Sequence, residues 1–246
     1  MKNADAWRPS KYVFRNGVLA GSRDRAEVGV GSRLISDLIA RAYDINLPKH
    51  ASGRLLDLGC GKVPLYLAYK SLVTENVCVD WQNTLHKNEY LDHECDLTVA
   101  LPFAGESFDT IILSDVLEHI PEPALLWQEI ARLLTAKGKL LMNVPFYYSI
   151  HEQPHDYYRY TEFGLRRFVE AAGLRLLDLE AIGGAPEIVA DIFAKNILRL
   201  PYAGAPLSMF SQWMTHWLVT TGPGARISRA TRSNFPIAYF LVAEKP

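Results

Sequence analysis

The sequence predicts an α/β fold in which a mostly parallel sheet carries helices on both faces. Short apolar runs typical of strands alternate with segments whose apolar residues recur at helical spacing. The first run, residues 54–58, stops at a glycine-rich turn, and the second, residues 76–80, ends in a carboxylate. This alternation is typical of parallel strands joined by crossover helices.

Six segments have the composition of strands, and helical patterns lie between them. The predicted strands are residues 54–58, 76–80, 108–114, 139–144, 174–179 and 236–242. Pro64 suits the first turn of the helix after the first strand. Thr161 is a candidate N-cap, and Gly138 and Gly173 are candidate helix ends.

The chain divides into an appended segment and one main domain. Residues 1–50 are predicted to be an N-terminal helical extension, with a helix that ends near Tyr43 and with Pro48 closing the segment. Residues 51–246 form the main domain. Between its last two strands lies an insertion, about residues 184–234, which is long enough to need its own helices.

Composition excludes several functional classes for this protein. The net charge of −1 over 246 residues leaves no basic footprint for a nucleic-acid partner. Cys60, Cys78 and Cys95 form no CxxC pair and are expected to be reduced thiols. The first residues contain no apolar signal region, and no run of 18 apolar residues occurs. We therefore expect a cytoplasmic protein, with contact to the inner face of a membrane as an alternative.

The predicted strand ends carry residues suited to a nucleoside. Ligands of open parallel sheets bind beyond the carboxyl ends of the strands, where Asp57-x-Gly59-x-Gly61 and Asp80 fall. A dinucleotide fingerprint would need a third glycine at Pro64, and a phosphate loop would need a glycine at Leu56. Neither is completed, so a ligand with adenine and ribose but no pyrophosphate fits best.

These residues resemble the signature of class I S-adenosylmethionine (SAM)-dependent methyltransferases, in particular the bacterial type 11 methyltransferase domain family. The similarity covers about residues 50–180 and depends on several segments in family order, although Lys139 stands where members usually have a second glycine. The segments are residues 55–61, 79–80, 96–97, 101–103, 107–109, 114–120, 131–134 and 137–139. The resemblance implies a Rossmann-like, seven-stranded, mostly parallel sheet of order 3-2-1-4-5-7-6, with a helical insertion before the last strand.

The resemblance also implies SAM as the cofactor and assigns residues to it. Asp57 and the glycines would hold the methionine part, Asp80 the ribose, Asp96 with Leu97 the adenine edge, and Ser114 would lie beside the sulfonium. Asp57 and Ser114 have the alternative of being turn formers, and His119 that of a helix-terminal histidine. The implied cofactor-binding residues are Asp57, Gly59, Cys60, Gly61, Asp80, Trp81, Asp96, Leu97, Ser114 and His119.

Residues 151–161 are the candidate catalytic segment, because they follow the strand that ends at Pro145 and are rich in His, Tyr and acidic residues. We expect His155 or His151 to act as general base, oriented by Asp156 or Glu152, because the pKa of histidine lies near working pH. The alternative is that these residues only order the loop.

The same segment offers a metal site as an alternative. His151, His155 and Asp156 offer ligand atoms for a divalent cation, but Pro154 disfavours the helix that the His-x-x-x-His spacing needs. We predict no metal site.

The insertion should contribute to the acceptor side. One helical face carries Phe210, Trp213, Met214, Trp217 and Leu218. This face is expected to pack on its own domain or on a second copy in a homodimer, with a lid over the acceptor or a contact to a membrane surface through residues 207–218 as alternatives. The arginines that follow either meet phosphate groups or are solvated; they are Arg226, Arg229 and Arg232.

The sequence therefore predicts an enzyme that methylates a hydroxyl of a small-molecule or saccharide acceptor. The acceptor class is implied by the resemblance of Pro145-Phe146 and residues 155–161 to type 11 methyltransferases of polysaccharide and secondary-metabolite pathways. The alternatives are N- or C-methylation of a small molecule and a non-catalytic SAM-binding regulatory protein. Methylation of nucleic acid or protein is disfavoured, because only Asn143-Val144-Pro145-Phe146 loosely echoes an amino-methylation motif.

Overall fold

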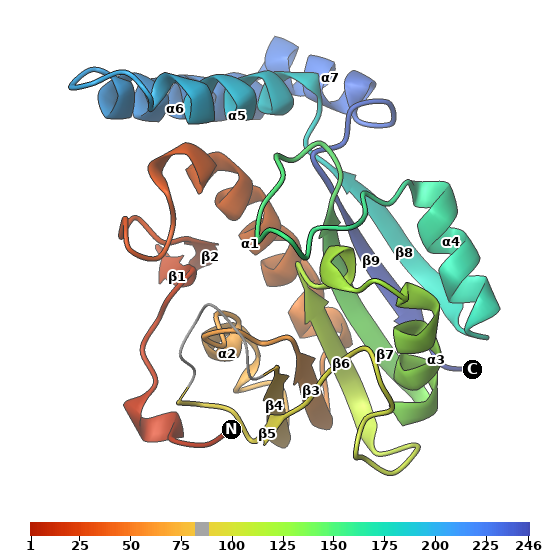
Figure 1. Ribbon diagram of the computed structural model, residues 1–246. Helices are drawn as coiled ribbons and strands as arrows, with labels where there is room; N and C mark the ends of the chain where they lie inside the picture. The colour runs from red at the N-terminus through yellow and green to blue at the C-terminus, as the bar shows by residue number, and fades with distance from the viewer. Residues whose placement is uncertain (82–88) are drawn as a thin grey trace. The chain divides into compact units, whose positions relative to one another are not determined.

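The computed structural model describes residues 1–81 and 89–246, which form two compact units (Figure 1). Unit 1 contains residues 1–9, 45–180 and 239–246, and unit 2 contains residues 10–44 and 181–238.

Unit 1 is built on a seven-stranded sheet of order β5-β4-β3-β6-β7-β9-β8. Counted along the chain from β3, this is the predicted order 3-2-1-4-5-7-6, which is confirmed. The strands from β5 to β7 pair in parallel. Strand β9 is antiparallel, because Lys245 at its end exchanges hydrogen bonds with Lys137 and Gly138 near the start of β7. The strands are β3 (Arg54–Leu58), β4 (Glu75–Asp80), β5 (His93–Glu94), β6 (Phe108–Ser114), β7 (Leu134–Pro145), β8 (Arg175–Ile182) and β9 (Ala238–Glu244).

The register of the sheet brings the predicted site residues to one edge. Leu58 pairs with Val79 of β4 and with Leu113 of β6, and Ser114 pairs with Asn143 of β7. The central strands β3 and β6 are mostly buried and mostly apolar, as expected for parallel strands covered on both faces. Their carboxyl ends therefore present the turns after β3, β4, β6 and β7 side by side.

The helices of unit 1 are α2 (Tyr66–Tyr69), α3 (Pro123–Leu133) and α4 (Glu162–Ala171), with 3₁₀ turns η1 (Ala4–Ala6) and η3 (Leu117–His119). Thr161 caps α4 as predicted, since its hydroxyl accepts from the Gly164 N–H. Gly173, with φ of 71°, follows the end of α4 as predicted. The prediction for Gly138 is wrong: α3 ends at Leu133 and Gly138 lies within β7, where its carbonyl accepts from the Lys245 N–H of the neighbouring chain segment.

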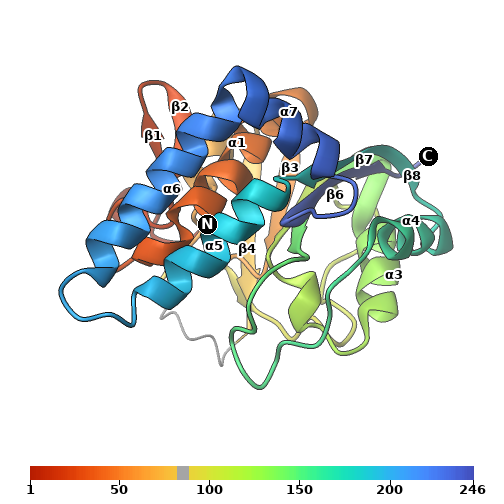
Figure 2. The ribbon, with the colours of Figure 1, turned by 90° about the horizontal axis from the view of Figure 1, so that it is seen from above.

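Unit 2 combines a β-hairpin with helices (Figure 2). The insertion forms helices, as predicted, whereas the hairpin was not predicted although Asn16-Gly17 is a hairpin-turn signal. Helix α1 continues through Pro48 to His50, so the predicted end near Tyr43 is wrong. The elements are β1 (Tyr12–Arg15), β2 (Val18–Gly21), η2 (Val30–Ser32), α1 (Arg33–His50, which enters unit 1 at Ile45), α5 (Ala185–Ile197), α6 (Gly204–Thr220) and α7 (Gly222–Thr231).

Among the described residues, no helix has both the length and the apolar character needed to cross a membrane.

Candidate cofactor and catalytic site

The turn after β3 has backbone conformations that favour glycine. Gly59 and Gly61 have φ of 66° and 51°. A Cβ on Gly59 would lie 2.5 Å from a methyl carbon of Val116, so any larger residue would displace the turn. A Cβ on Gly61 would meet no atom within 4 Å. The turn is therefore tight at Gly59 and leaves open space at Gly61, where a ligand can approach the backbone.

Asp80 closes this turn from the end of β4. One of its carboxylate oxygens accepts from the Gly61 N–H at 2.9 Å, and the other accepts from the Trp81 N–H at 2.8 Å. The Cys95 N–H donates to the Asp80 carbonyl at 2.9 Å, which brings residues 95–97 beside β4. The predicted ribose and adenine residues are thus neighbours in space.

Of the predicted cofactor residues, Asp96 has an exposed carboxylate and Asp57 has a buried one. The exposed carboxylate of Asp96 accepts from the N–H and hydroxyl of Thr98, while the Leu97 side chain is buried. The Asp57 carboxyl is buried and accepts from the Tyr69 hydroxyl at 3.1 Å. Burial raises the pKa of Asp57 to about 7, against the opposing effect of the Tyr69 hydrogen bond. Asp57 therefore belongs to the core beneath the turn.

Ser114 belongs to a short chain of polar groups at the ends of β6 and β7. Its hydroxyl donates to the Asn143 side-chain oxygen at 2.8 Å, and the Asn143 amide donates to Asp115 at 2.5 Å. Asp115 has φ of 52°, the left-handed region that is uncommon for residues other than glycine. This chain fixes the turn between β6 and η3.

Glu118 is a site residue that sequence reasoning missed. Its side chain is fully buried, and the Nε2 atoms of His119 and His151 each lie 3.7 Å from its Oε1. Among the described residues, neither carboxylate oxygen of Glu118 has a donor at hydrogen-bond distance. Burial raises the pKa of Glu118, with His151 acting in the opposite direction. The available signal was its place inside residues 114–120, which carry part of the family resemblance.

The Nε2 atom of His119 faces Glu118. Its Nδ1 lies 2.7 Å from the His155 carbonyl oxygen. Because a carbonyl only accepts, Nδ1 carries the proton of the neutral ring and Nε2 keeps its lone pair. Glu118, His119 and His151 together place three possible ligand atoms within 4.8 Å of one another, a donor set that suits a divalent cation. Of the metal ligands weighed from the sequence, this cluster includes His151 and omits His155 and Asp156.

His151 lies between two carboxyl groups. Its backbone N–H donates to Asp156 at 2.9 Å and its Nδ1 lies 3.4 Å from the same oxygen, while its Nε2 faces Glu118. Burial alone would lower the pKa of His151, but Glu118 and Asp156 outweigh it and the net shift is upward. Arg159 donates twice to Asp156, which holds the pKa of that carboxyl well below its ordinary value.

His155 is exposed and adjoins the end of β4. Its ring meets the Trp81 ring edge-on, with centroids 5.2 Å apart, and its Nδ1 lies 3.2 Å from the Tyr157 hydroxyl. The N–H groups of Tyr157 and Tyr158 donate to the Glu118 carbonyl at 2.9 and 3.3 Å. The segment 151–161 is thus tied to η3 on one side and contacts a predicted cofactor residue on the other.

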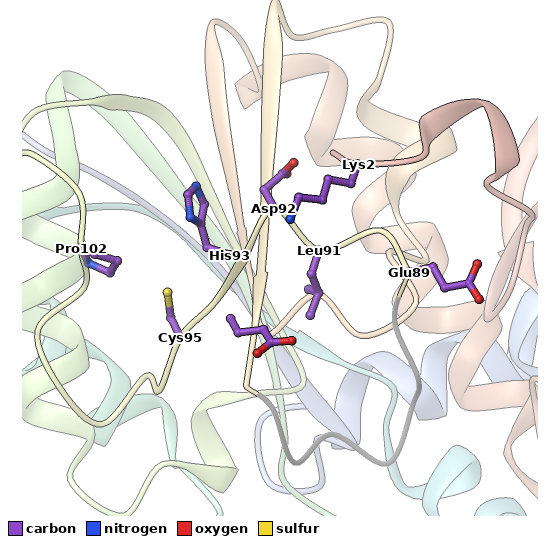
Figure 3. A pocket seen from close by; sticks show the side chains of 8 residues that line it. Lys2, Glu89, Leu91, Asp92, His93, Cys95 and Pro102 are labelled. Carbon is purple, nitrogen blue, oxygen red and sulfur yellow. The ribbon is translucent and has the colours of Figure 1, made fainter.

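A separate cavity of about 490 Å³ lies beside β5 (Figure 3). Its lining includes Lys2, Asp92, His93 and Cys95, and none of the residues predicted to bind the cofactor. The cavity is therefore distinct from the glycine turn.

Comparisons with known proteins agree with this geometry. A methyltransferase domain model matches residues 56–142. The ubiquinone biosynthesis O-methyltransferase of Aeromonas salmonicida is 25% identical over 74% of this chain and 75% of its own length. A methyltransferase chain from Haloferax volcanii, solved in complex with the Trm112 activator, has a TM-score of 0.55 at 18% identity, covering 84% of this chain and 88% of its own. A SAM-dependent methyltransferase from Mesorhizobium loti has a TM-score of 0.54 at 14% identity, covering 86% and 99%.

The fold, the glycine turn and the acidic end of β4 define a Rossmann-like nucleoside-binding domain. With the match of residues 56–142 to a methyltransferase domain, these features support a SAM-dependent methyltransferase. The residues fit the cofactor, since Gly61 leaves its approach open and Asp80 lies beside it.

Proposed function

We propose that this chain transfers the methyl group of SAM to a hydroxyl of a small-molecule or saccharide acceptor, with His155 as general base. The observation that carries the proposal is the contact between His155 and Trp81 at the cofactor edge of the sheet. The name of the Aeromonas salmonicida relative, an O-methyltransferase, supports oxygen as the accepting atom.

Each residue has a role that its contacts allow. Gly59, Gly61 and Asp80 hold the cofactor, which when bound supplies a methyl group already activated on a sulfonium. The Tyr157 hydroxyl can accept from Nδ1–H of His155, which leaves Nε2 to take the proton of the acceptor hydroxyl. His119 and Glu118 position His155 through its carbonyl and through the following backbone.

His151 is the weaker candidate for the base. It lies between Glu118 and Asp156, and its raised pKa means that it retains its proton to higher pH than an ordinary histidine. A protonated imidazole cannot accept the proton of a hydroxyl. We therefore assign His151 to positioning the segment rather than to proton transfer.

The test is the His155→Ala variant assayed with a panel of hydroxyl, amine and carbon acceptors, with formation of S-adenosylhomocysteine as the readout. We expect kcat to fall by about 10²–10⁴-fold because the general base is lost, while calorimetry gives unchanged SAM affinity. His216→Ala, an exposed histidine on α6, is the matched control and should retain full turnover.

Three outcomes would contradict the proposal. Full activity of His155→Ala would remove this residue from proton transfer. Turnover with only amine or carbon acceptors would show that the methyl group goes to nitrogen or carbon and not to oxygen. SAM binding without turnover on any acceptor would favour the non-catalytic regulatory alternative.

A further inference from the structure

Helix α6 has its apolar face exposed and its polar face buried. Its two exposed tryptophans, Trp213 and Trp217, have 64% and 58% of their surface accessible. The buried residues of α6 are Gly204, Ser208, Ser211, Gln212 and Thr215. The exposed apolar residues, called here the α6 stripe, are Leu207, Phe210, Trp213, Met214, Trp217 and Leu218. One expectation from the sequence was that this face packs within the chain. That expectation is wrong, because the structure leaves the face exposed.

Gln212 fixes this orientation. Its amide nitrogen donates to the Val30 carbonyl at 2.7 Å, and its carbonyl accepts from the Leu34 N–H at 2.9 Å. Rotating α6 to bury the stripe would leave these buried polar groups without partners, at a cost of about 1–3 kcal/mol per group. The exposure of the stripe is therefore built into the packing of unit 2.

Helix α5 continues the same arrangement. It runs beside α6 in both views, and no other element of unit 2 covers the two helices in Figure 2. Val189, Ile192 and Phe193 are exposed, while Glu187 and Asp191 are buried. Small and polar residues between helices, with large apolar residues outside, are the pattern of helices that face lipid.

Unit 2 is also cationic within a nearly neutral chain. It holds eleven Lys and Arg residues against six Asp and Glu, whereas the whole chain has a net charge of −1. A groove of about 880 Å³ within unit 2 is lined by both Trp213 of the stripe and six arginines, with two acidic residues. The arginines are Arg15, Arg23, Arg33, Arg41, Arg229 and Arg232.

The acidic residues of the groove do not neutralise it. Asp37 pairs with Arg15 and Arg23, and Arg41 pairs with Asp44 outside the groove lining, while Glu187 accepts from the Ser228 hydroxyl. Within the described part of the chain, Arg33 has no ion-pair partner, and its Nε has no acceptor. Burial and the neighbouring Arg23 and Arg25 lower the pKa of Arg33 against the smaller, opposite effect of Asp37, and a bound anion would oppose this lowering. The groove is thus chemically suited to phosphate.

We propose that unit 2 docks on a bilayer that contains anionic phospholipids, with the α6 stripe and the exposed face of α5 in the interfacial layer and the groove arginines on headgroup phosphates. Tryptophan is enriched at membrane–water interfaces, and interfacial helices combine such aromatics with basic residues. A second copy of the chain is a poorer occupant, because two cationic units would face each other across the contact.

The test is sedimentation of the full-length protein with vesicles of phosphatidylcholine alone or with 30% phosphatidylglycerol. We expect binding to the anionic vesicles, weakened by high salt. Trp213→Ser/Trp217→Ser should lower the partition coefficient by about tenfold or more, because interfacial aromatic area is lost. Arg229→Gln/Arg232→Gln, which replaces two of the groove arginines, should lower it by about fivefold per arginine at low salt.

Matched controls come from α4 of unit 1. Phe163→Ser removes an aromatic residue that is 74% exposed, and Arg166→Gln/Arg167→Gln removes two exposed arginines; all should bind as the parent does. Circular dichroism checks that each variant is folded. Equal binding to neutral vesicles, or equal loss in the α4 variants, would overturn the proposal. So would absence of vesicle binding together with a solution dimer that the tryptophan variant dissociates.

Discussion

At the scale of single residues, the most informative group is the carboxyl of Glu118. The sequence places Asp156 or Glu152 beside the candidate catalytic histidines, and the structure pairs His151 with Asp156, whereas Glu118 was not anticipated. Glu118 reaches His151 across the turn after β6 and the loop after β7, and no local pattern encodes such a pairing. Among the described residues neither oxygen of this buried carboxyl has a hydrogen-bond donor, which is energetically unfavourable for the folded protein.

Replacing Glu118 should change the titration of His151. In the parent, the pKa of His151 is raised, so the stability that its pairing contributes is fully present below pH 6.5 and is lost as pH rises through the raised pKa. Glu118→Gln removes the negative partner, and we expect the pKa of His151 to fall. The measurement is a histidine NMR titration, which isolates this ring from the titration of Glu118 itself.

The control for this titration is Glu152→Gln, since Glu152 is exposed and lies 3.9 Å from His119. It should leave the pKa of His151 near its parent value. An unchanged midpoint for His151 in Glu118→Gln would show that Asp156 alone raises its pKa.

At the scale of elements, strands were predicted best where they are buried apolar runs ended by a glycine or polar residue. β3 and β6 have the predicted bounds for this reason. β5 has two exposed residues, His93 and Glu94, and offers no pattern to detect. Gly138 misled the helix prediction because a glycine at a strand irregularity has the same local appearance as a helix end: β6 and β7 shift register between Phe108 and Thr110.

Helix α6 shows what periodicity cannot determine. The spacing of its aromatics predicted a single apolar face, but not whether that face is buried. The direction depends on Gln212 and its partners Val30 and Leu34, which come from a distant segment. The helix is thus oriented by long-range polar bonds rather than by its own amphipathic pattern.

Gln212→Leu should therefore destabilise the protein by about 1–3 kcal/mol, because the Leu34 N–H and Val30 carbonyl lose their partner while buried. Its neighbour Trp213→Ser, at an exposed position, should change the free energy of unfolding by no more than about 0.5 kcal/mol. Urea denaturation of both variants checks this. The reverse order of effects would mean that the stripe is buried in solution.

At the scale of the whole molecule, the sequence predicted the sheet order and the carboxyl-edge location of the proposed cofactor residues, because strand order follows from the family resemblance. The net charge of −1 for the whole chain gave no sign that unit 2 is cationic. Unit 2 combines residues 10–44 with residues 181–238. These segments lie far apart in the sequence, so their charges are not added together when the sequence is read in order. Proposed cofactor residues such as Gly61 and Asp80 belong to unit 1, whereas the groove and the α6 stripe belong to unit 2.

This division predicts that SAM stabilises the two units unequally. Hydrogen exchange followed by mass spectrometry, with SAM at 100 times its Kd, should slow exchange in β3, β4 and the turn after β3 by up to about 100-fold, since binding to the native state adds about 2.7 kcal/mol to its stability. Exchange in α6 should stay within twofold of the free protein, because local openings in different units need not be coupled. Equal slowing in α6 and β3 would instead show that both units open together, and the cofactor would then act on the lipid-docking surface as well as on its own site.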